Sequence, residues 1–279
     1  MPPLSSAELA PWIERIQARR TVIRAEIAPR RIKLYLLVSQ ILSAPRRARK
    51  ALGRSSAPTP ELQLPWLPLW PALTAKPFHN ARDYPWGRAL EDGADDIRGE
   101  LNQVRADEFG RAAYDSDRNV KTWRAFYFYF GGRPVQKNLD ACPKTAKILR
   151  ELPTNKNHVC FSGIEPGGIL QPHTGPTNTS LTAHLGLANC KGASIWVAGQ
   201  QQKYRDGKLL FFDDSFVHWV EHSGNQIRYT LMITLWHPEL NAIEREILGA
   251  LIRTTPQGIL KSKTPNPMDR TDSFTGANQ

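Results

Sequence analysis

Short β-rich segments separated by turns fill the chain from Val159 to Trp236, and they constrain the fold more than any other feature. Gly, Pro and Asn residues mark the turns between them. Six strands in roughly 80 residues are typical of an antiparallel barrel or sandwich of jelly-roll type. We therefore predict a mainly β fold with flanking helices, and these six strands: His158–Ile164, Ser180–Leu187, Ser194–Ala198, Leu209–Phe212, Val217–Glu221 and Arg228–Trp236.

Other patterns divide the chain into four parts. Residues 1–54 form a basic helical arm, with an amphipathic helix up to Ile27 that Pro29 ends. Residues 55–80 are a Pro- and Trp-rich connecting segment, expected to lie against the body because exposed Trp side chains are costly. Residues 81–253 hold the β domain, and residues 254–279 are expected to be a flexible tail. Within the domain we expect helices over 83–101, 142–153 and 241–253, and an aromatic strand in 122–132.

The positive charge is concentrated in the arm. Residues 1–54 carry 12 lysines and arginines against 3 acidic residues, a net charge of +9 out of +11 for the whole chain. A nucleic-acid enzyme normally carries its charge around the active-site cleft, so we expect no nucleic-acid partner. The arm is either an interfacial helix that contacts anionic lipid or a partner, or a helix packed on the body with a solvated basic flank, which is the commoner case.

Cysteine usage and hydropathy indicate a cytoplasmic protein. Cys142, Cys160 and Cys190 are an odd, widely spaced set that suggests reduced thiols rather than a disulfide framework. No stretch approaches the roughly 18 apolar residues of a membrane span, and the first 30 residues do not read as a signal peptide. Peripheral membrane contact through residues 1–54 remains an alternative.

Two histidines 45 residues apart, His173 and His218, lie in β-rich segments, and Arg228 follows ten residues later. This order is typical of a non-haem iron oxygenase, in which imidazoles hold Fe(II) and the Arg binds the far carboxylate of a 2-oxo acid. The usual triad needs an acid two residues after the first His, where this chain has Gly175.

Further polar residues recur on segments that should line the interior. Ser162 and His184 join His173, His218 and Arg228 there. A lone strand His is more often a satisfied core residue, but an apolar core has no use for three imidazoles and a cation. A buried Arg needs an anion, and none is evident on the neighbouring strands, so a bound dicarboxylate is a candidate.

The strings PHTGPTN, HLGL, DDSF-x-H and WHPEL resemble the aspartyl/asparaginyl β-hydroxylase family over roughly Pro65 to Leu251. The resemblance implies a double-stranded β-helix fold of cupin-like jelly-roll type and an oxygenase that uses Fe(II), 2-oxoglutarate and O2. It also implies a two-histidine iron site in which Gly takes the place of the triad acid, as Gly175 does here. His173 and His218 would then be the only protein ligands of the metal.

By motif position, the resemblance assigns Arg228 and Ser162 to the distal carboxylate of 2-oxoglutarate. His184 would lie at the metal-proximal end, and Trp123 would wall the pocket. Animal members have Arg at the position of Thr182, where it contacts cosubstrate and substrate, so recognition of an Asp or Asn side chain is in doubt. They also carry a disulfide of which only Cys142 remains.

Other chemically active residues receive structural roles. His237 in WHPEL is expected to fix a corner by hydrogen bonds. Asp213 and Asp214 are expected to cap a turn or to support the metal ligands from outside. His158 and His222 receive no functional assignment.

Three functions are compatible with these observations. The first is β-hydroxylation of an amino-acid or peptidyl residue, for instance in a natural-product pathway, with a small-molecule or peptide substrate. The second is hydroxylation of an acyl chain at the membrane surface, as in lipid A hydroxylases, which resemble this family. The third is a non-catalytic binding barrel of the cupin kind.

Overall fold

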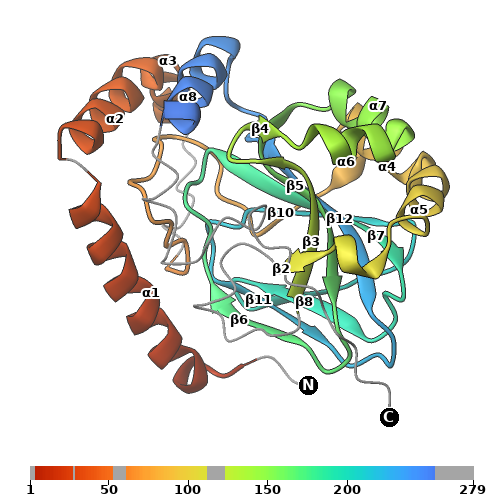
Figure 1. The fold of residues 1–279 in the computed structure, drawn as a ribbon. Coiled ribbons are helices and arrows are strands. Elements are labelled where there is room, and N and C mark those ends of the chain that lie inside the picture. The colour runs from red at the N-terminus through yellow and green to blue at the C-terminus, as the bar shows by residue number, and fades with distance from the viewer. Residues whose placement is uncertain (1–3, 28, 53–60, 112–122, 255–279) are drawn as a thin grey trace.

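Two antiparallel sheets form the centre of the fold (Figure 1). The structure is a computed structural model, and it describes residues 4–27, 29–52, 61–111 and 123–254. The eight-stranded sheet has the order β1 (Phe78–His79), β10 (Leu209–Phe212), β7 (Ser180–Ala188), β12 (Arg228–Trp236), β5 (Thr154–Ile164), β3 (Trp123–Phe130) and β2 (Gly110–Arg111), with β4 (Arg133–Pro134) paired to β3. The four-stranded sheet has the order β6 (Ile169–His173), β11 (His218–His222), β8 (Ala193–Val197) and β9 (Gln200–Lys203). This architecture confirms the predicted mainly β fold of jelly-roll type with flanking helices.

Side chains alternate between the two faces of the sheet along most of the three central strands β5, β7 and β12, apart from register shifts near their ends. Successive residues of a strand point to opposite faces of its sheet. The odd-numbered residues face the helices and form an apolar core there: Val159, Phe161, Leu181, Ala183, Leu185, Leu187, Leu231, Ile233 and Leu235. Even-numbered residues such as Cys160 and Ile164 instead pack with Ile195, Val197 and Val220 of the smaller sheet. The predicted site residues of these strands are all even-numbered, so they face the space between the sheets.

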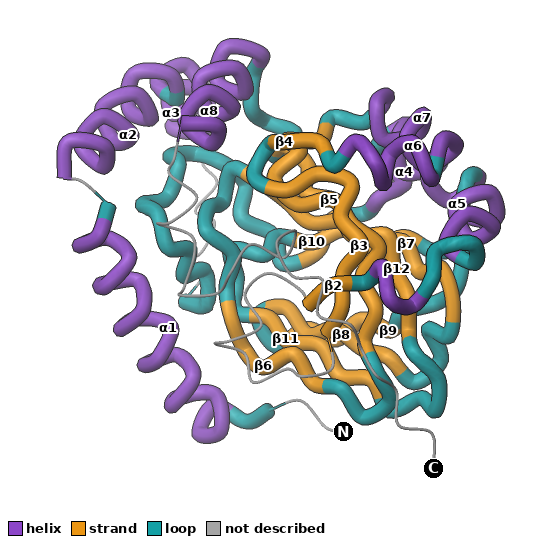
Figure 2. Tube along the Cα trace, in the orientation of Figure 1, coloured by secondary structure: helices purple, strands orange, loops and turns teal. Residues whose placement is uncertain are grey.

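Four helices cover the outer face of the larger sheet: α4 (Pro85–Asp92), α5 (Ala94–Leu101), α6 (Gln136–Ala141) and α7 (Pro143–Glu151) (Figure 2). Short 3-10 turns at Ala81–Asp83 and Ala106–Glu108 flank the first two helices. The helix expected over 83–101 is divided at Gly93, where an added Cβ would lie 2.8 Å from the Ile148 side chain of α7. Leu90, Ile97 and Leu149 are fully buried in the core beneath these helices.

The basic arm packs on the body as helices α1 (Ser6–Glu26), α2 (Pro29–Leu42) and α3 (Ala44–Leu52), with α8 (Ala242–Thr254) beside α3 (Figure 1). Ser5 begins α1 with a capping box to Glu8. On the inner side of α1, Leu9 packs against Trp196 and Trp219 of the smaller sheet, whose indoles are stacked at 5.5 Å. The arm is therefore part of the folded body in the described residues.

The Pro- and Trp-rich segment lies against the body, as predicted, in the part that begins at residue 61. Trp66 and Trp70 are buried, and the Trp70 indole donates to the Glu244 carboxylate of α8 at 2.9 Å. Leu64 donates its backbone N–H to Ser215, next to the turn that precedes β11. The tail expected to be flexible, residues 255–279, lies outside the described residues.

All three cysteines are buried and free. Within the described ranges, none of the helices combines the length and apolarity needed to cross a membrane.

Candidate active site

His173 and His218 lie directly opposite each other on the paired strands β6 and β11. Their ring centroids are 4.1 Å apart with the planes inclined by 56°. Strand pairing therefore brings together two residues that are 45 positions apart in the sequence, as the iron-ligand hypothesis requires.

Backbone carbonyls fix the tautomer of both rings. Nδ1 of His173 lies 2.6 Å from the Gln171 carbonyl oxygen, and Nδ1 of His218 lies 2.8 Å from that of Phe216. A carbonyl oxygen only accepts, so each Nδ1 carries the hydrogen and donates. The lone pair is then on Nε2, the arrangement in which histidines commonly bind metals.

The space beside Gly175 is occupied by the carboxylate of Asp214. An added Cβ at residue 175 would lie 2.5 to 2.6 Å from all three atoms of that carboxyl group. The backbone N–H of Gly175 also donates to the Asp214 carbonyl oxygen at 2.6 Å, and Thr182 donates its hydroxyl to the Asp214 carboxylate at 3.0 Å. A carboxyl group thus borders the position of the usual triad acid, but another residue supplies it.

Asp213 caps the turn that leads into β11, as expected for this pair of aspartates. Its carboxylate accepts from the backbone N–H and hydroxyl of Ser215 at 2.9 and 2.5 Å, and from the Gln63 amide at 3.1 Å. Burial raises the pKa of Asp213 to about 8, and the neighbouring charge of Asp214 adds to this shift. The two adjacent aspartates therefore have different surroundings.

Arg228 is a buried cation without a carboxylate partner among the described residues. Only 1% of it is exposed. Nη1 donates to the Thr230 hydroxyl at 3.0 Å, the guanidinium lies 4.6 Å from the Tyr204 ring centroid, and Nε has no hydrogen-bond partner. Burying a guanidinium with so few partners is costly, so the site is suited to an anionic ligand.

Ser162 and Trp123 form a donor pair near Arg228. The Trp123 indole donates to the Ser162 hydroxyl oxygen at 2.9 Å, which leaves the hydroxyl hydrogen of Ser162 available to a ligand. Ser162 on β5 is directly paired with Thr230 on β12, the residue that accepts from Arg228.

His184 is close enough to both Arg228 and His218 to feel their charges. Its Nδ1 is 2.8 Å from the Tyr204 hydroxyl, and the Phe212 ring lies 5.1 Å from His184 and 5.7 Å from His218. Burial, with the charges of Arg228 and His218, lowers the pKa of His184 well below its ordinary value, so the ring is neutral. A phenol is the better donor of the two, so we assign the hydrogen of His184 to Nε2, a buried atom without a hydrogen-bond partner.

Tyr204 is the site residue that sequence reasoning missed. It is 3% exposed, and it follows β9 in a turn with no strand-like pattern of its own. Gly186 of the HLGL string is the one signal that points to it. An added Cβ at residue 186 would lie 2.2 Å from the Arg205 carbonyl oxygen, so only Gly lets the Tyr204 turn approach β7 this closely.

His237 has the structural role expected of it. Its Nδ1 accepts from the Glu239 backbone N–H, and Nε2 therefore donates to the Thr74 carbonyl oxygen, both at 3.2 Å. These bonds hold the corner after β12 to the segment that carries Trp70.

His173 and His218 are two imidazoles without a third metal-binding side chain grouped with them among the described residues. Among them, no group of three or more His, Cys, Asp and Glu residues could hold a metal. Two imidazoles with defined Nε2 lone pairs fit Fe(II) if a chelating ligand fills the remaining positions, and Arg228 fits the charge of such a ligand.

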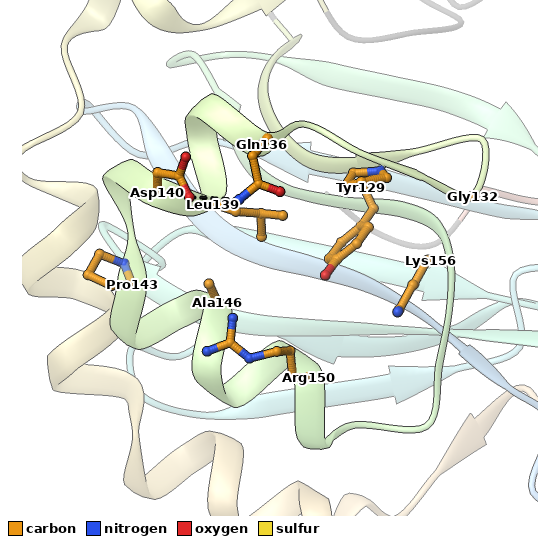
Figure 3. A pocket seen from close by; sticks show the side chains of 10 residues that line it. Tyr129, Gly132, Gln136, Leu139, Asp140, Pro143, Ala146, Arg150 and Lys156 are labelled. Atoms are coloured by element: carbon orange, nitrogen blue, oxygen red, sulfur yellow. Dashed lines mark hydrogen bonds between the residues drawn. The ribbon is translucent and has the colours of Figure 1, made fainter.

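A separate groove of about 540 Å³ lies between β3 and the helices α6 and α7 (Figure 3). Tyr129 and Leu139 form its apolar floor, and the side chains of Arg150 and Lys156 border it. It contains none of the predicted site residues and is distinct from the histidine pair.

Comparison with known proteins gives one family match. The family model described as aspartyl/asparaginyl beta-hydroxylase matches residues 91–238, a range that contains all the predicted site residues. The human aspartate beta-hydroxylase domain-containing protein 2 is 37% identical over 134 residues, which cover 45% of this chain and 36% of that protein. Human aspartyl/asparaginyl beta-hydroxylase is 35% identical over 143 residues, which cover 48% of this chain and 19% of that protein. The chain thus spans about a third or less of these relatives.

Solved structures give more distant matches. A prolyl hydroxylase from Trichoplax adhaerens, in complex with a hypoxia inducible factor peptide, has a TM-score of 0.39 at 13% identity, and covers 56% of this chain and 81% of that chain. A prolyl-4-hydroxylase from Pseudomonas putida has a TM-score of 0.35 at 16% identity, and the match covers 53% of this chain and 97% of that chain.

Proposed function

Because the chain belongs to the aspartyl/asparaginyl beta-hydroxylase family, we propose that it is an Fe(II)- and 2-oxoglutarate-dependent dioxygenase. Its reaction would hydroxylate an unactivated carbon, first of all the β-carbon of an amino-acid or peptidyl residue. One observation carries the proposal: His173 and His218 are direct strand partners with the same tautomer, in an interior that also holds the buried cation Arg228.

The two histidines would hold the metal through Nε2, while the backbone carbonyls keep both rings in place. Together, bound iron, 2-oxoglutarate and O2 supply the oxidising chemistry, which yields succinate, CO2 and a hydroxylated carbon. Asp214 lies beside Gly175, where it is placed to accept hydrogen bonds from water on the open side of the site.

Three residues would bind and orient 2-oxoglutarate. Arg228 would bind its distal carboxylate with the guanidinium nitrogens that its own fold leaves available, and Ser162 would donate its hydroxyl hydrogen to the same group. His184 would donate from Nε2 toward the end near the metal. This orientation fixes the keto acid toward the histidine pair, and alignment of the reacting groups is a large part of what such a site contributes.

Aromatic side chains would keep the reaction away from bulk water. Trp123 and Phe212 are 5% and 1% exposed and lie within the interior cluster between the two sheets. A dry interior limits unproductive oxidation of the protein and strengthens the interaction of Arg228 with its anion.

The proposed substrate class rests on the hydrogen bond that Thr182 makes. Its hydroxyl is bonded to Asp214, so this position offers no cation to a polar substrate side chain. A small molecule or a peptide is the proposed substrate class, with no nucleic acid involved, and we place the reaction in the cytoplasm on the evidence of three free thiols. Hydroxylation of an acyl chain is the second candidate, because such a substrate needs no cation at residue 182.

Succinate formation tests the proposal. The full chain with Fe(II), ascorbate and 2-oxoglutarate is expected to produce succinate, and a mass-spectrometric screen of peptides, amino acids and acyl lipids is expected to find a product that gains one oxygen atom. His173→Ala and His218→Ala should abolish both signals, while His158→Gln, which lies outside the site, should retain them. Wild-type turnover by either alanine variant would refute the iron assignment. Absence of turnover across the panel, with 2-oxoglutarate still bound, would favour a binding barrel.

A further inference from the structure

The outer face of α2 is aliphatic and exposed. Leu34, Leu37 and Ile41 are 50%, 59% and 62% exposed. Their i, i+3, i+7 spacing places them on one side of the helix. On most protein surfaces, exposed aliphatic residues occur singly. Three of them on one face of a helix therefore indicate a contact surface.

The adjacent face of α2 is already packed on the body. Tyr35 is buried and meets the Trp70 ring edge-on at 5.4 Å, while Val38 and Leu42 pack against the cluster that contains Leu248 of α8. The apolar sector of α2 therefore spans two adjoining faces, and the described part of the protein covers only one of them. α2 packs on the body and exposes Arg30 and Lys33, and it also exposes leucine and isoleucine side chains, which a solvated basic flank alone does not explain.

Positive charge surrounds the aliphatic stripe. Arg30 and Lys33 are exposed at the start of α2, and Arg47 is exposed on the following helix α3. Residues 1–54 carry +9 of the net charge of +11. A second copy of the chain would bring the same positive charge to the contact. The stripe also lacks the Trp and Tyr residues that dominate protein–protein contacts.

We propose that α2 binds the surface of an anionic membrane, with Leu34, Leu37 and Ile41 inserted at the boundary of headgroups and acyl chains. Arg30, Lys33 and Arg47 would contact lipid phosphates. Helices of this kind lie in the membrane plane, and their binding depends on both buried apolar area and anionic lipid. The inference is independent of the iron chemistry, since no residue of the site takes part.

Vesicle cosedimentation of the full chain tests the inference. We expect binding to phosphatidylcholine vesicles that contain phosphatidylglycerol, and weak binding to pure phosphatidylcholine. The triple variant Leu34→Ser/Leu37→Ser/Ile41→Ser should lower the partition coefficient about tenfold or more, because both apolar contact and anchoring are lost. Arg30→Gln/Lys33→Gln should weaken binding mainly at low ionic strength.

The matched control is Val22→Ser/Leu69→Ser, which removes exposed aliphatic side chains elsewhere (56% and 41% exposed) and should bind as the wild type does. All substitutions lie on exposed positions, so melting temperatures should remain equal, and succinate formation reports separately on the active site. Failure of the wild type to bind anionic vesicles, or equal binding by the triple variant, would overturn the inference. So would a concentration-dependent dimer that the triple variant abolishes without vesicle binding, since the stripe would then contact a second copy.

Discussion

At the scale of single residues, the buried guanidinium of Arg228 destabilises the site when no anion is bound. A guanidinium that is 1% exposed and has one hydroxyl partner loses most of its hydration without gaining a counter-ion. Sequence reasoning identified this residue and its need for an anion, because a cation in an apolar strand is conspicuous. The fold adds that Thr230 and Tyr204 hold its orientation.

The variant Arg228→Met should lose 2-oxoglutarate binding without losing folding stability. The variant is expected to melt at the wild-type temperature or above without cosubstrate, since an unpaired buried charge is removed. The rise in melting temperature that 2-oxoglutarate gives the metal-loaded wild type should disappear. Arg133→Met, at an exposed position, should change neither value. A large loss of stability in the cosubstrate-free variant would contradict this interpretation.

Tyr204→Phe should weaken 2-oxoglutarate binding through His184. Loss of one buried hydrogen bond is worth about 0.5 to 1.5 kcal/mol, which corresponds to a Kd increase of roughly two- to tenfold. Without the phenol hydroxyl the proton of His184 is free to move between its nitrogens, so the 15N shifts of that ring should move toward tautomer averaging. A purely structural role of Tyr204 would lower the melting temperature and leave the 15N shifts in place.

Asp213 should make stability depend on pH. Burial raises the pKa of Asp213 to about 8 in the folded state, from an ordinary value of 3.8 in the unfolded chain. Between these values the folded protein holds a proton that the unfolded chain releases, so the free energy of unfolding should fall as pH rises from about 4 to about 8. Asp213→Asn should flatten this slope in urea titrations at several pH values, while Asp92→Asn, on the surface, should keep it. An unchanged slope in Asp213→Asn would show that Asp213 is ionised in the fold.

At the scale of elements, the strands with mostly apolar sequences could be predicted, and those with polar or proline-containing sequences could not. The bounds of β10 and β12 agree with the sequence, because β10 is a continuous apolar run and β12 is largely apolar. β9 was missed because its sequence QQQK is polar and all four of its residues are exposed. β6 was missed because a proline interrupts it, yet it carries His173 and obtains its place by pairing with β11.

The contact of Gly175 with Asp214 could not be predicted either, because it joins two turns that follow different strands. Gly175→Ala should cost about 1 to 3 kcal/mol of unfolding free energy, since its Cβ would overlap the Asp214 carboxylate. In an Asp214→Ala background the same substitution should cost far less, and urea unfolding of the four proteins measures the difference. Equal cost in both backgrounds would place the strain elsewhere.

At the scale of the whole molecule, a buried ion pair joins the N-terminal arm to the last described helix, α8. Arg46 of α3 forms a bidentate pair with Glu244 of α8 at 2.7 and 3.0 Å, with 7% and 0% of the side chains exposed. Trp70 donates to the same carboxylate. The sequence showed Arg46 only as one member of a basic run, since the partner lies 198 residues away.

Arg46→Ala should therefore destabilise the protein by about 3 to 5 kcal/mol, because Glu244 would remain buried and charged. The double variant Arg46→Met/Glu244→Leu should recover most of this loss in thermal and urea unfolding. Arg47→Ala, one residue further along the same basic run and exposed, is the matched control and should have little effect. Similar losses in both single variants would indicate that charge alone, and not the buried pair, stabilises the arm.

The alternation of faces along β5, β7 and β12 also limits how the length of this chain can vary. Insertion or deletion of one residue inside any of these strands would turn the even-numbered side chains toward the helices. Leucine and valine side chains would then face the space between the sheets in place of Ser162, His184 or Arg228. Changes of two residues would preserve the facing. We therefore expect single-residue insertions and deletions in proteins of this kind to fall in the turns, and those within the three strands to occur in pairs or beside a compensating bulge.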